Sequence, residues 1–330
     1  MIEPAAVRRI AVVLPDMIGT TVCALPALGA IAARFPRAAV QLFGFDPVSR
    51  FLCDEPCGRD LVLLDRSRLA AQLTERLAAP PDLAFDLLGA DASLGALAGA
   101  GARQLVGWPD RAGRVTIAVP CPAERHQLAV QDYLDFLTAV DAPAPFSAPR
   151  LTAAPATRAR GRDWLRGHGV ADDETLVVLG VGGGNDHKRW PLARFLELAD
   201  RLAGRGRAIV FAGPCETELA LRLRAAPGER VVAASLPLDL AKGIIAGARL
   251  AVCNDHSMMH VAAALQVPTI GVFLASDPGE WFPHPPPSRY VIGPPLACRP
   301  CYRDDCEDWR CNDATLARQV WRGVEELLPG

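Results

Sequence analysis

Residues 250–265 read LAVCNDHSMMHVAAAL, and this run indicates the architecture of the chain. Its first part, Leu250–Cys253, is a short and continuous apolar run, as in a parallel strand buried on both faces. The polar loop that follows opens a helix over His256–Leu265, and Thr269–Phe273 is a second apolar run. The order strand, helix, strand predicts a parallel sheet covered by helices.

The same alternation extends along the chain in both directions. Further strands are predicted at residues 9–14, 40–43, 61–64, 83–88, 175–181 and 208–211, and further helices at 22–35, 126–140, 191–202 and 216–225. Residues 141–162 have no period and are rich in Pro, Ala and Arg, so we interpret them as a connection between domains. The predicted fold is α/β, with two Rossmann-like domains whose parallel sheets face a cleft. One continuous α/β domain is the alternative.

The predicted boundaries are residues 1–150, residues 151–312 and a closing amphipathic helix within residues 313–330. The length of 330 residues, with 50% hydrophobic and 22% charged residues, excludes a disordered chain and a scaffold held only by disulfides. Lys and Arg number 35 against 37 Asp and Glu, so nucleic acid is not the expected partner. Residues 1–9 carry no apolar leader and no run of about 18 apolar residues occurs, so we expect a cytoplasmic protein and leave peripheral membrane contact open.

Three strand-to-helix junctions of the second half are rich in polar groups. The first, residues 181–191 (VGGGNDHKRWP), combines glycines that let the backbone approach a ligand with the positive charge of Lys188 and Arg189. A flexible turn with solvated basic residues is the alternative reading. The second junction brings Glu216, which either accepts hydrogen bonds from a ribose diol or lies in the first turn of a helix because the helix dipole favours it there.

The third junction is the polar loop of the opening run. Free N–H groups at the start of its helix would hold a pyrophosphate, and Asp255 is equally a good N-cap. His260 follows His256 by four residues and so lies on the same face of the helix. The sequence offers no third ligand for a metal bound by these two histidines.

These junctions, in this order, resemble glycosyltransferase family 9, the ADP-heptose heptosyltransferases of bacterial surface polysaccharide assembly. Lys188–Pro191 is similar to the family's Lys-x-Trp-Pro element, and Asp255–His260 to its Asp-Thr-Gly-x-x-His signature. Residues 18–28 resemble its opening loop and helix, and residues 82–89 its Asp-rich fourth strand. The resemblance implies a GT-B fold, with the acceptor on the first domain, the nucleotide sugar on the second, and the closing helix packed back on the first.

The resemblance also implies roles for individual residues. Lys188 would contact the donor's phosphates, Glu216 the adenosine ribose, and Asp255 the pyrophosphate and sugar. The other residues implied in donor binding are Gly19, Gly183, Gly184, His256, Ser257 and His260. Asp16, Thr20, Lys188 and Asp255 are the implied catalytic set.

Two departures from the family pattern bear on this set. The family's opening loop carries an aspartate as general base where this chain has Thr20, and a threonine hydroxyl cannot serve as that base near neutral pH. Asp16, His126 or a carboxylate of the acceptor would take its place, or the protein is a catalytically silent relative. The second departure puts His256 and Ser257 in place of Thr-Gly, where a protonated imidazole would stabilise the departing ADP.

Four thiols gather in the spacing Cys298-x2-Cys301-x4-Cys306-x4-Cys311. They predict either a structural zinc or iron site or free thiols and disulfides. No Asp-x-Asp motif is present, so we expect no catalytic metal.

Together these features predict an inverting glycosyltransferase that moves a heptose-type sugar from an ADP-sugar to a hydroxyl of a surface polysaccharide, a protein or a small molecule. The alternatives are a silent nucleotide-sugar-binding relative and a GT-B enzyme using another nucleotide sugar, such as an epimerase acting on a UDP-sugar. The sequence leaves the oligomeric state open.

Overall fold

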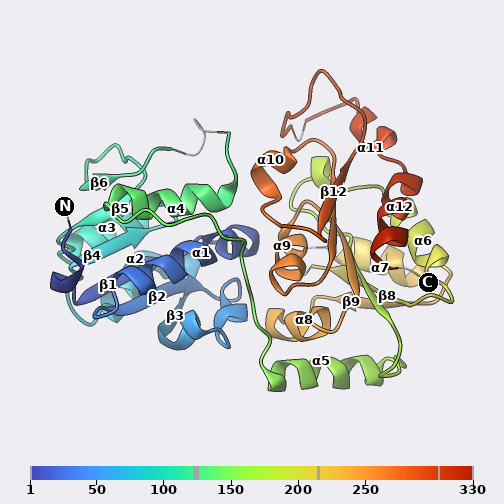
Figure 1. The fold of residues 1–330 in the computed structure, drawn as a ribbon, viewed down its shortest axis with the longest axis horizontal. Helices are drawn as coiled ribbons and strands as arrows, with labels where there is room; N and C mark the ends of the chain where they lie inside the picture. The colour runs from blue at the N-terminus through green and yellow to red at the C-terminus, as the bar shows by residue number, and fades with distance from the viewer. Residues whose placement is uncertain (1, 122–125, 214–215, 304, 329–330) are drawn as a thin grey trace. The chain divides into compact units, whose positions relative to one another are not determined.

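The computed structural model describes residues 2–121, 126–213, 216–303 and 305–328 (Figure 1). The chain divides into two compact units between Arg150 and Leu151. Each unit has its own sheet, and the two are described separately.

Unit 1 is built on a six-stranded parallel sheet in the order β3-β2-β1-β4-β5-β6. Its strands are β1 (Arg9–Val13), β2 (Ala39–Phe45), β3 (Leu61–Leu64), β4 (Leu83–Asp86), β5 (Leu105–Gly107) and β6 (Ile117–Ala118). Its α-helices are α1 (Ile18–Arg34), α2 (Leu69–Arg76), α3 (Asp91–Gly99) and α4 (Ala129–Ala139). The central strands are apolar and buried, which is why they form the middle of the sheet.

A carboxylate closes the loop after β4. Asp86 Oδ1 accepts hydrogen bonds from the N–H groups of Leu88 and Gly89, both at 3.0 Å, and its Oδ2 accepts the hydroxyl of Ser93 at 2.6 Å. Burial raises the pKa of Asp86, while these three bonds oppose the rise. Asp86 therefore fixes the backbone of the loop after β4, at the carboxyl end of that strand.

Unit 2 repeats the architecture with the order β12-β11-β10-β7-β8-β9, again all parallel. Its strands are β7 (Leu176–Gly180), β8 (Arg207–Ala212), β9 (Arg230–Ala234), β10 (Leu250–Asn254), β11 (Thr269–Phe273) and β12 (Arg289–Ile292). Its α-helices are α5 (Pro155–Gly167), α6 (Leu192–Arg201), α7 (Thr217–Ala225), α8 (Leu238–Ile245), α9 (Ser257–Ala264), α10 (Pro278–Trp281), α11 (Arg310–Ala314) and α12 (Ala317–Leu327). The prediction of an α/β fold with two parallel sheets is confirmed.

The two sheets share one strand order when each unit is numbered from its own first strand, because both orders then read 3-2-1-4-5-6. In such sheets the chain leaves the first and fourth strands toward opposite faces, and ligands bind at the carboxyl ends of these two strands. In unit 1 these are β1 and β4, and in unit 2 they are β7 and β10. The candidate residues after β1, β7 and β10 thus lie at the expected edges.

The interdomain connection was predicted to be irregular through residue 162, and that prediction is wrong because α5 begins at Pro155. This helix packs closely on α8: a Cβ at Gly161 would lie 2.5 Å from the carbonyl carbon of Gly243. Its exposed faces are rich in arginine, which hides the apolar period that predicts a helix. The buried face of α5 is narrow and consists of Thr157, Gly161 and Leu165.

The closing helix α12 was expected to pack back on the first domain. That packing stays a prediction, and within unit 2 the apolar face of α12 joins the core, where Ala317, Val320 and Val324 are buried, and the helix contacts α6, β11 and β12. The many apolar side chains of that core offer this amphipathic helix a face to bury against.

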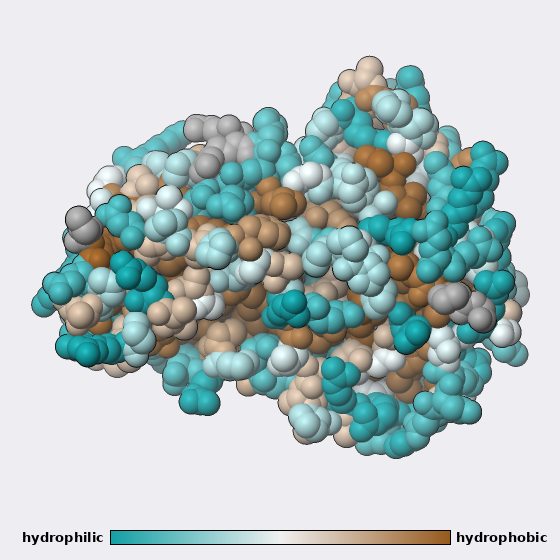
Figure 2. Space-filling view, viewed as in Figure 1, coloured by the Kyte–Doolittle hydropathy of each residue, from teal (hydrophilic) through white to brown (hydrophobic). Residues whose placement is uncertain are grey.

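Polar side chains cover most of the face seen in Figure 2, with apolar residues showing between them in small groups. Among the described residues, no helix has both the length and the apolar character that crossing a membrane requires.

Candidate active site

Two loops at the carboxyl edge of the second sheet are joined by one carboxylate. Glu216 Oε1 accepts the N–H of Gly183 at 2.8 Å, and Oε2 accepts the N–H of Gly213 at 2.6 Å. Glu216 is the N-cap residue of α7, but its side chain does not cap that helix. Each oxygen keeps a further lone pair, so the carboxylate can still accept bonds from a ligand.

The glycines after β7 differ in the free backbone groups and the open space that they leave for a ligand. The N–H of Gly183 is taken by Glu216, and its carbonyl accepts Arg189 Nε at 2.9 Å. Gly184 is exposed, and a Cβ there would meet nothing within 4 Å. Of the two glycines after β7 that are predicted to bind a donor, Gly184 is the one with open space around it.

Lys188 and Asp255 form an ion pair, with Nζ 2.8 Å from Oδ2. The side chain of Asp255 is 2% exposed and that of Lys188 is 21% exposed. Asp255 directly follows β10, and Lys188 ends the 3-10 turn Asp186–Lys188 in the loop after β7. The pair holds one N–H of the ammonium and leaves the others for a ligand on the open side.

Asn254 connects these two strand ends, and sequence reasoning did not select it. Its Nδ2 donates to the carbonyls of Val181 at 2.9 Å and Gly182 at 3.0 Å, and its Oδ1 accepts the N–H of Trp190 at 3.1 Å. The side chain is fully buried. A polar residue at the end of an apolar strand is the pattern that could have pointed to it.

His256 caps α9, a role that the sequence analysis gave to Asp255. Its Nδ1 accepts the N–H of Met258 at 3.0 Å, so the ring proton is on Nε2, which lies 3.2 Å from the carbonyl of Gly180. Burial lowers the pKa of His256. The lowered pKa favours the neutral ring, and both ring nitrogens bond to backbone. Ser257 is the first residue of α9 and is half-buried.

His260 pairs with another histidine. Its Nδ1 lies 3.2 Å from Nε2 of His284, and both side chains are buried. Burial lowers the pKa of His260 to about 3 and that of His284 to about 2, so both rings are neutral. Its contact with His284 makes His260 a packing residue of α9 as well as a candidate for the donor site.

In unit 1, Gly19 and Thr20 lie in the first turn of α1, which begins at Ile18, earlier than predicted. The hydroxyl of Thr20 donates to the carbonyl of Met17 at 3.0 Å. Asp16 precedes this turn and forms an ion pair with Arg66 at 2.6 Å. Tyr133 on α4 hydrogen-bonds with Thr20, and burial raises the pKa of its phenol. Of these side chains, Asp16 alone is a carboxylate able to accept a proton near neutral pH.

The four cysteines, for which the sequence leaves a structural metal or free thiols and disulfides open, carry free thiols in the structure. Within the described ranges, no three His, Cys, Asp or Glu side chains are placed to hold a metal ion. The guanidinium of Arg299 instead lies among Cys298, Cys301 and Cys311, and burial lowers its pKa. The thiol of Cys306 donates to the carbonyl of Asp308, with Sγ 3.1 Å from the oxygen.

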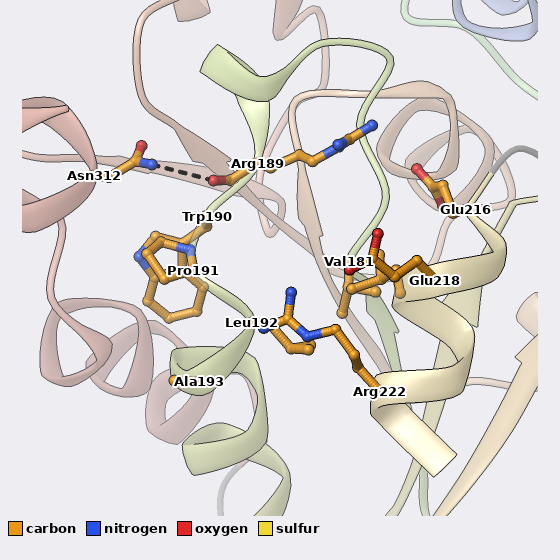
Figure 3. A pocket seen from close by; sticks show the side chains of 11 residues that line it. Val181, Arg189, Trp190, Pro191, Leu192, Ala193, Glu216, Glu218, Arg222 and Asn312 are labelled. Carbon is orange, nitrogen blue, oxygen red and sulfur yellow. Dashed lines mark hydrogen bonds between the residues drawn. The ribbon is translucent and has the colours of Figure 1, made fainter. Parts of the chain in front are cut away.

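A pocket of about 560 Å³ opens between α6 and α7 (Figure 3). The end of Arg189 extends toward Glu216 there, and α7 contributes Glu218 and Arg222. The remaining lining residues are Val181, Trp190, Pro191, Leu192, Ala193, Leu219 and Asn312. Arg189 thus belongs to this pocket, and Lys188 is the basic residue at the cluster around Asp255.

Comparison with known proteins agrees with this arrangement. The sequence profile of a family described as glycosyltransferase family 9 (heptosyltransferase) matches residues 84–309. Lipopolysaccharide heptosyltransferase 1 of Pseudomonas aeruginosa is 35% identical over 121 residues, which cover 36% of this chain and 34% of that protein. The matched region is therefore about a third of that relative's length.

Two solved structures share the fold over nearly the whole chain. A glycosyl transferase family 9 protein from Veillonella parvula has a TM-score of 0.85 at 17% identity, covering 99% of this chain and 98% of that one. The ADP-heptose lps heptosyltransferase II of E. coli has a TM-score of 0.81 at 22% identity, covering 97% and 98%. The GT-B-like fold is shown by these similarities.

Proposed function

The chain belongs to glycosyltransferase family 9, the heptosyltransferase family, and we propose that it transfers a heptose-type sugar from an ADP-sugar to an acceptor hydroxyl. The observation that carries the proposal is the Lys188–Asp255 ion pair at 2.8 Å, located where the loop after β7 meets the start of α9. A partly exposed lysine ammonium beside a helix N-terminus is suited to bind a diphosphate.

The donor would lie along the carboxyl edge of the second sheet. The ammonium of Lys188 binds the diphosphate beside the N-terminus of α9, whose dipole favours negative charge, and Asp255 holds the ammonium toward it. Glu216, whose oxygens keep free lone pairs, accepts the ribose hydroxyls. Gly184 gives the phosphates access to the loop because no side chain stands there.

The reaction is an inverting displacement at the anomeric carbon. The carboxylate of Asp16 takes the proton of the acceptor hydroxyl as its oxygen forms the new bond to the anomeric carbon. The bond from that carbon to the diphosphate breaks, and ADP leaves with the electron pair. Lys188 and the dipole of α9 stabilise the negative charge that develops on the leaving group.

Asp16 takes the role of base because it is the carboxylate at the end of β1, and Thr20 is committed to Met17. Its partner Arg66 is 75% exposed at the side chain. An exposed partner contributes little to stability, so the acceptor can displace it at small cost. His126, which is exposed, is the other side chain of this chain considered for the role.

We expect the protein to act in the cytoplasm. The acceptor hydroxyl would belong to a surface polysaccharide, a protein or a small molecule. The four cysteines Cys298, Cys301, Cys306 and Cys311 are given no role in the reaction.

Calorimetric titration with ADP, UDP and GDP tests the donor class. We expect ADP to bind most tightly and Asp255→Ala to weaken it by at least about tenfold, because the buried partner of Lys188 is removed. The matched control is Asp172→Asn, which removes a carboxylate paired with Arg166 at 2.6 Å in the loop before β7. Preference for UDP, or equal effects of both variants, would contradict the assignment.

The second candidate function is a silent nucleotide-sugar-binding protein, which Thr20 at the base position favours. Incubation with ADP-heptose and acceptor glycans separates the two. Release of ADP only when acceptor is present supports transfer, while tight donor binding with no ADP release under any acceptor supports the silent relative.

A further inference from the structure

Trp281 lies against the lysine of the proposed donor site. It is the last residue of α10 and is half-buried, and Lys188 Nζ lies 5.3 Å from the centre of its ring. An ammonium within about 6 Å of an aromatic face is attracted to it. Lys188 is therefore held from two sides, by the Asp255 carboxylate at 2.8 Å and by this ring.

A lysine needs such restraint if it is to meet a phosphate in one position. Its ammonium is a point charge on a flexible stem of four carbons, and ordering that stem weakens binding. The Asp255 carboxylate fixes the distance of the ammonium but not the path of the stem. A ring packed against the ammonium restricts the side chain further, so that less freedom is lost when a ligand binds.

Tyr302 holds the beginning of α10. Its hydroxyl accepts the N–H of Asp277 at 3.1 Å and donates to the carboxylate of Glu280. The ring of Tyr302 also meets the ring of His187 edge to face, with centres 6.4 Å apart. Because His187 precedes Lys188, Tyr302 contacts both the helix that ends in Trp281 and the turn that ends in Lys188.

A second contact holds the chain after Trp281. His284 bonds to His260 of α9 at 3.2 Å, and the ring of Phe282 packs edge to face on His284 with centres 5.3 Å apart. Helix α9 follows Asp255 directly. The segment that carries Trp281 is thus fastened at one end beside Lys188 and at the other end to the helix after Asp255.

We propose that Trp281 is a positioning residue for Lys188, which its ring holds toward the donor's diphosphate, and that Tyr302 positions Trp281. The inference rests on the proposed function, because it takes Lys188 as the residue that contacts the donor. Trp281 lies outside the sequence elements that resemble the family.

A double-mutant cycle with ADP affinity as the readout tests the proposal. Trp281→Leu is expected to weaken ADP binding about 3- to 10-fold in the otherwise unchanged protein. In the Lys188→Met background the same change is expected to have an effect below about twofold, because the group it positions is gone. Trp281→Phe keeps an aromatic face and should recover part of the affinity.

The matched control is Trp321→Leu on α12. Trp321 also packs against cations, with Arg201 and Arg205 at 5.8 and 5.6 Å from its ring, and it belongs to the same unit. Its loss should leave ADP affinity unchanged. Tyr302→Phe removes only the hydroxyl and should weaken ADP binding in the otherwise unchanged protein. In the Lys188→Met background the same substitution should have no effect on ADP affinity.

An equal loss from Trp281→Leu in both backgrounds, or no loss in either, overturns the inference. Failure of the proposed function is read separately, from the Lys188→Met variant alone. Unchanged ADP affinity in that variant means that Lys188 does not contact the donor, and both proposals then fall.

Discussion

The carboxylate of Glu216 lies so close to Gly182 that a Cβ at position 182 would come within 2.4 Å of its oxygens. The two residues belong to different loops, after β8 and after β7, and Glu216 bonds to the backbone of both. The absence of a side chain at position 182 is therefore a condition for joining the loops.

Gly182→Ala should displace this carboxylate. We expect the free energy of unfolding to fall by about 1–3 kcal/mol, since two hydrogen bonds to a charged acceptor are lost. ADP affinity should fall as well, because Glu216 can no longer face the ribose. Thermal unfolding and calorimetry measure both effects, and in a Glu216→Ala background the added methyl group should cost little. If Gly182→Ala destabilises the Glu216→Ala variant as much as the otherwise unchanged protein, the added methyl group clashes with a group other than Glu216.

Asn254→Asp should destabilise the protein more than Asn254→Ala. The aspartate would set a carboxylate oxygen against the carbonyls of Val181 and Gly182, where the amide now donates twice. Leaving such groups unpaired costs about 1–3 kcal/mol each, and a buried carboxylate that faces carbonyl oxygens costs more. Urea unfolding of the two variants checks the order, and equal stability of both would contradict it.

Stability should fall as the pH falls below about 6.5, the usual histidine pKa in an unfolded chain. His260 and His284 have pKa values lowered to about 3 and about 2, so between pH 6.5 and those values the unfolded chain binds protons that the folded protein does not. Each contributes a slope of up to about 1.4 kcal/mol per pH unit, and their contribution is constant above pH 6.5.

Urea unfolding at several pH values between 5 and 7 measures this slope. His284→Gln should make the slope shallower by the share of one histidine. If the slope is the same in that variant, protons are taken up at other groups.

Asp16→Asn should lower the turnover number by about 10²- to 10⁴-fold while leaving ADP affinity unchanged. Arg66→Gln, which breaks the same ion pair but keeps the carboxylate, is the matched control and should retain most of the activity. Steady-state kinetics with ADP-heptose separates the two. Similar losses in both variants would indicate that the ion pair matters for structure.

Gly161→Ala should lower the free energy of unfolding by about 1–3 kcal/mol, because the new methyl group would overlap the backbone of Gly243. Gly167→Ala in the same helix is the control, since a Cβ there meets nothing within 4 Å. Thermal unfolding compares them, and ADP affinity should be unchanged in both. Equal stability would mean that α5 moves away from α8 without cost.

Much of the fold could be predicted because buried parallel strands are continuous apolar runs. Strands β3 and β11 occupy the predicted residues, and β7, β8 and β10 differ from prediction by one residue at their ends. Helix α5 escaped prediction because arginines cover it and glycines make its contact. Short elements such as β6 and α11 carry too few residues for a period to show.

The site residues could be predicted where they directly follow a strand, because the end of the strand fixes their location in the sheet. Lys188 and Asp255 meet because parallel strands end at one edge of the sheet. The capping by His256 was not predictable, since it depends on which atoms its ring reaches. Trp281 was not either, because α10 is short and its contact with Lys188 is made across the fold.

The shared strand order of the two units has a consequence for how such chains diversify. Each unit closes its own sheet and core, and the boundary between Arg150 and Leu151 lies between α4 and α5, so an exchange of genetic material there interrupts no element. Under the proposed function, recognition of the nucleotide sugar would then pass on with the second half and recognition of the hydroxyl with the first. Chimaeras joined at this boundary would inherit the two specificities from different parents.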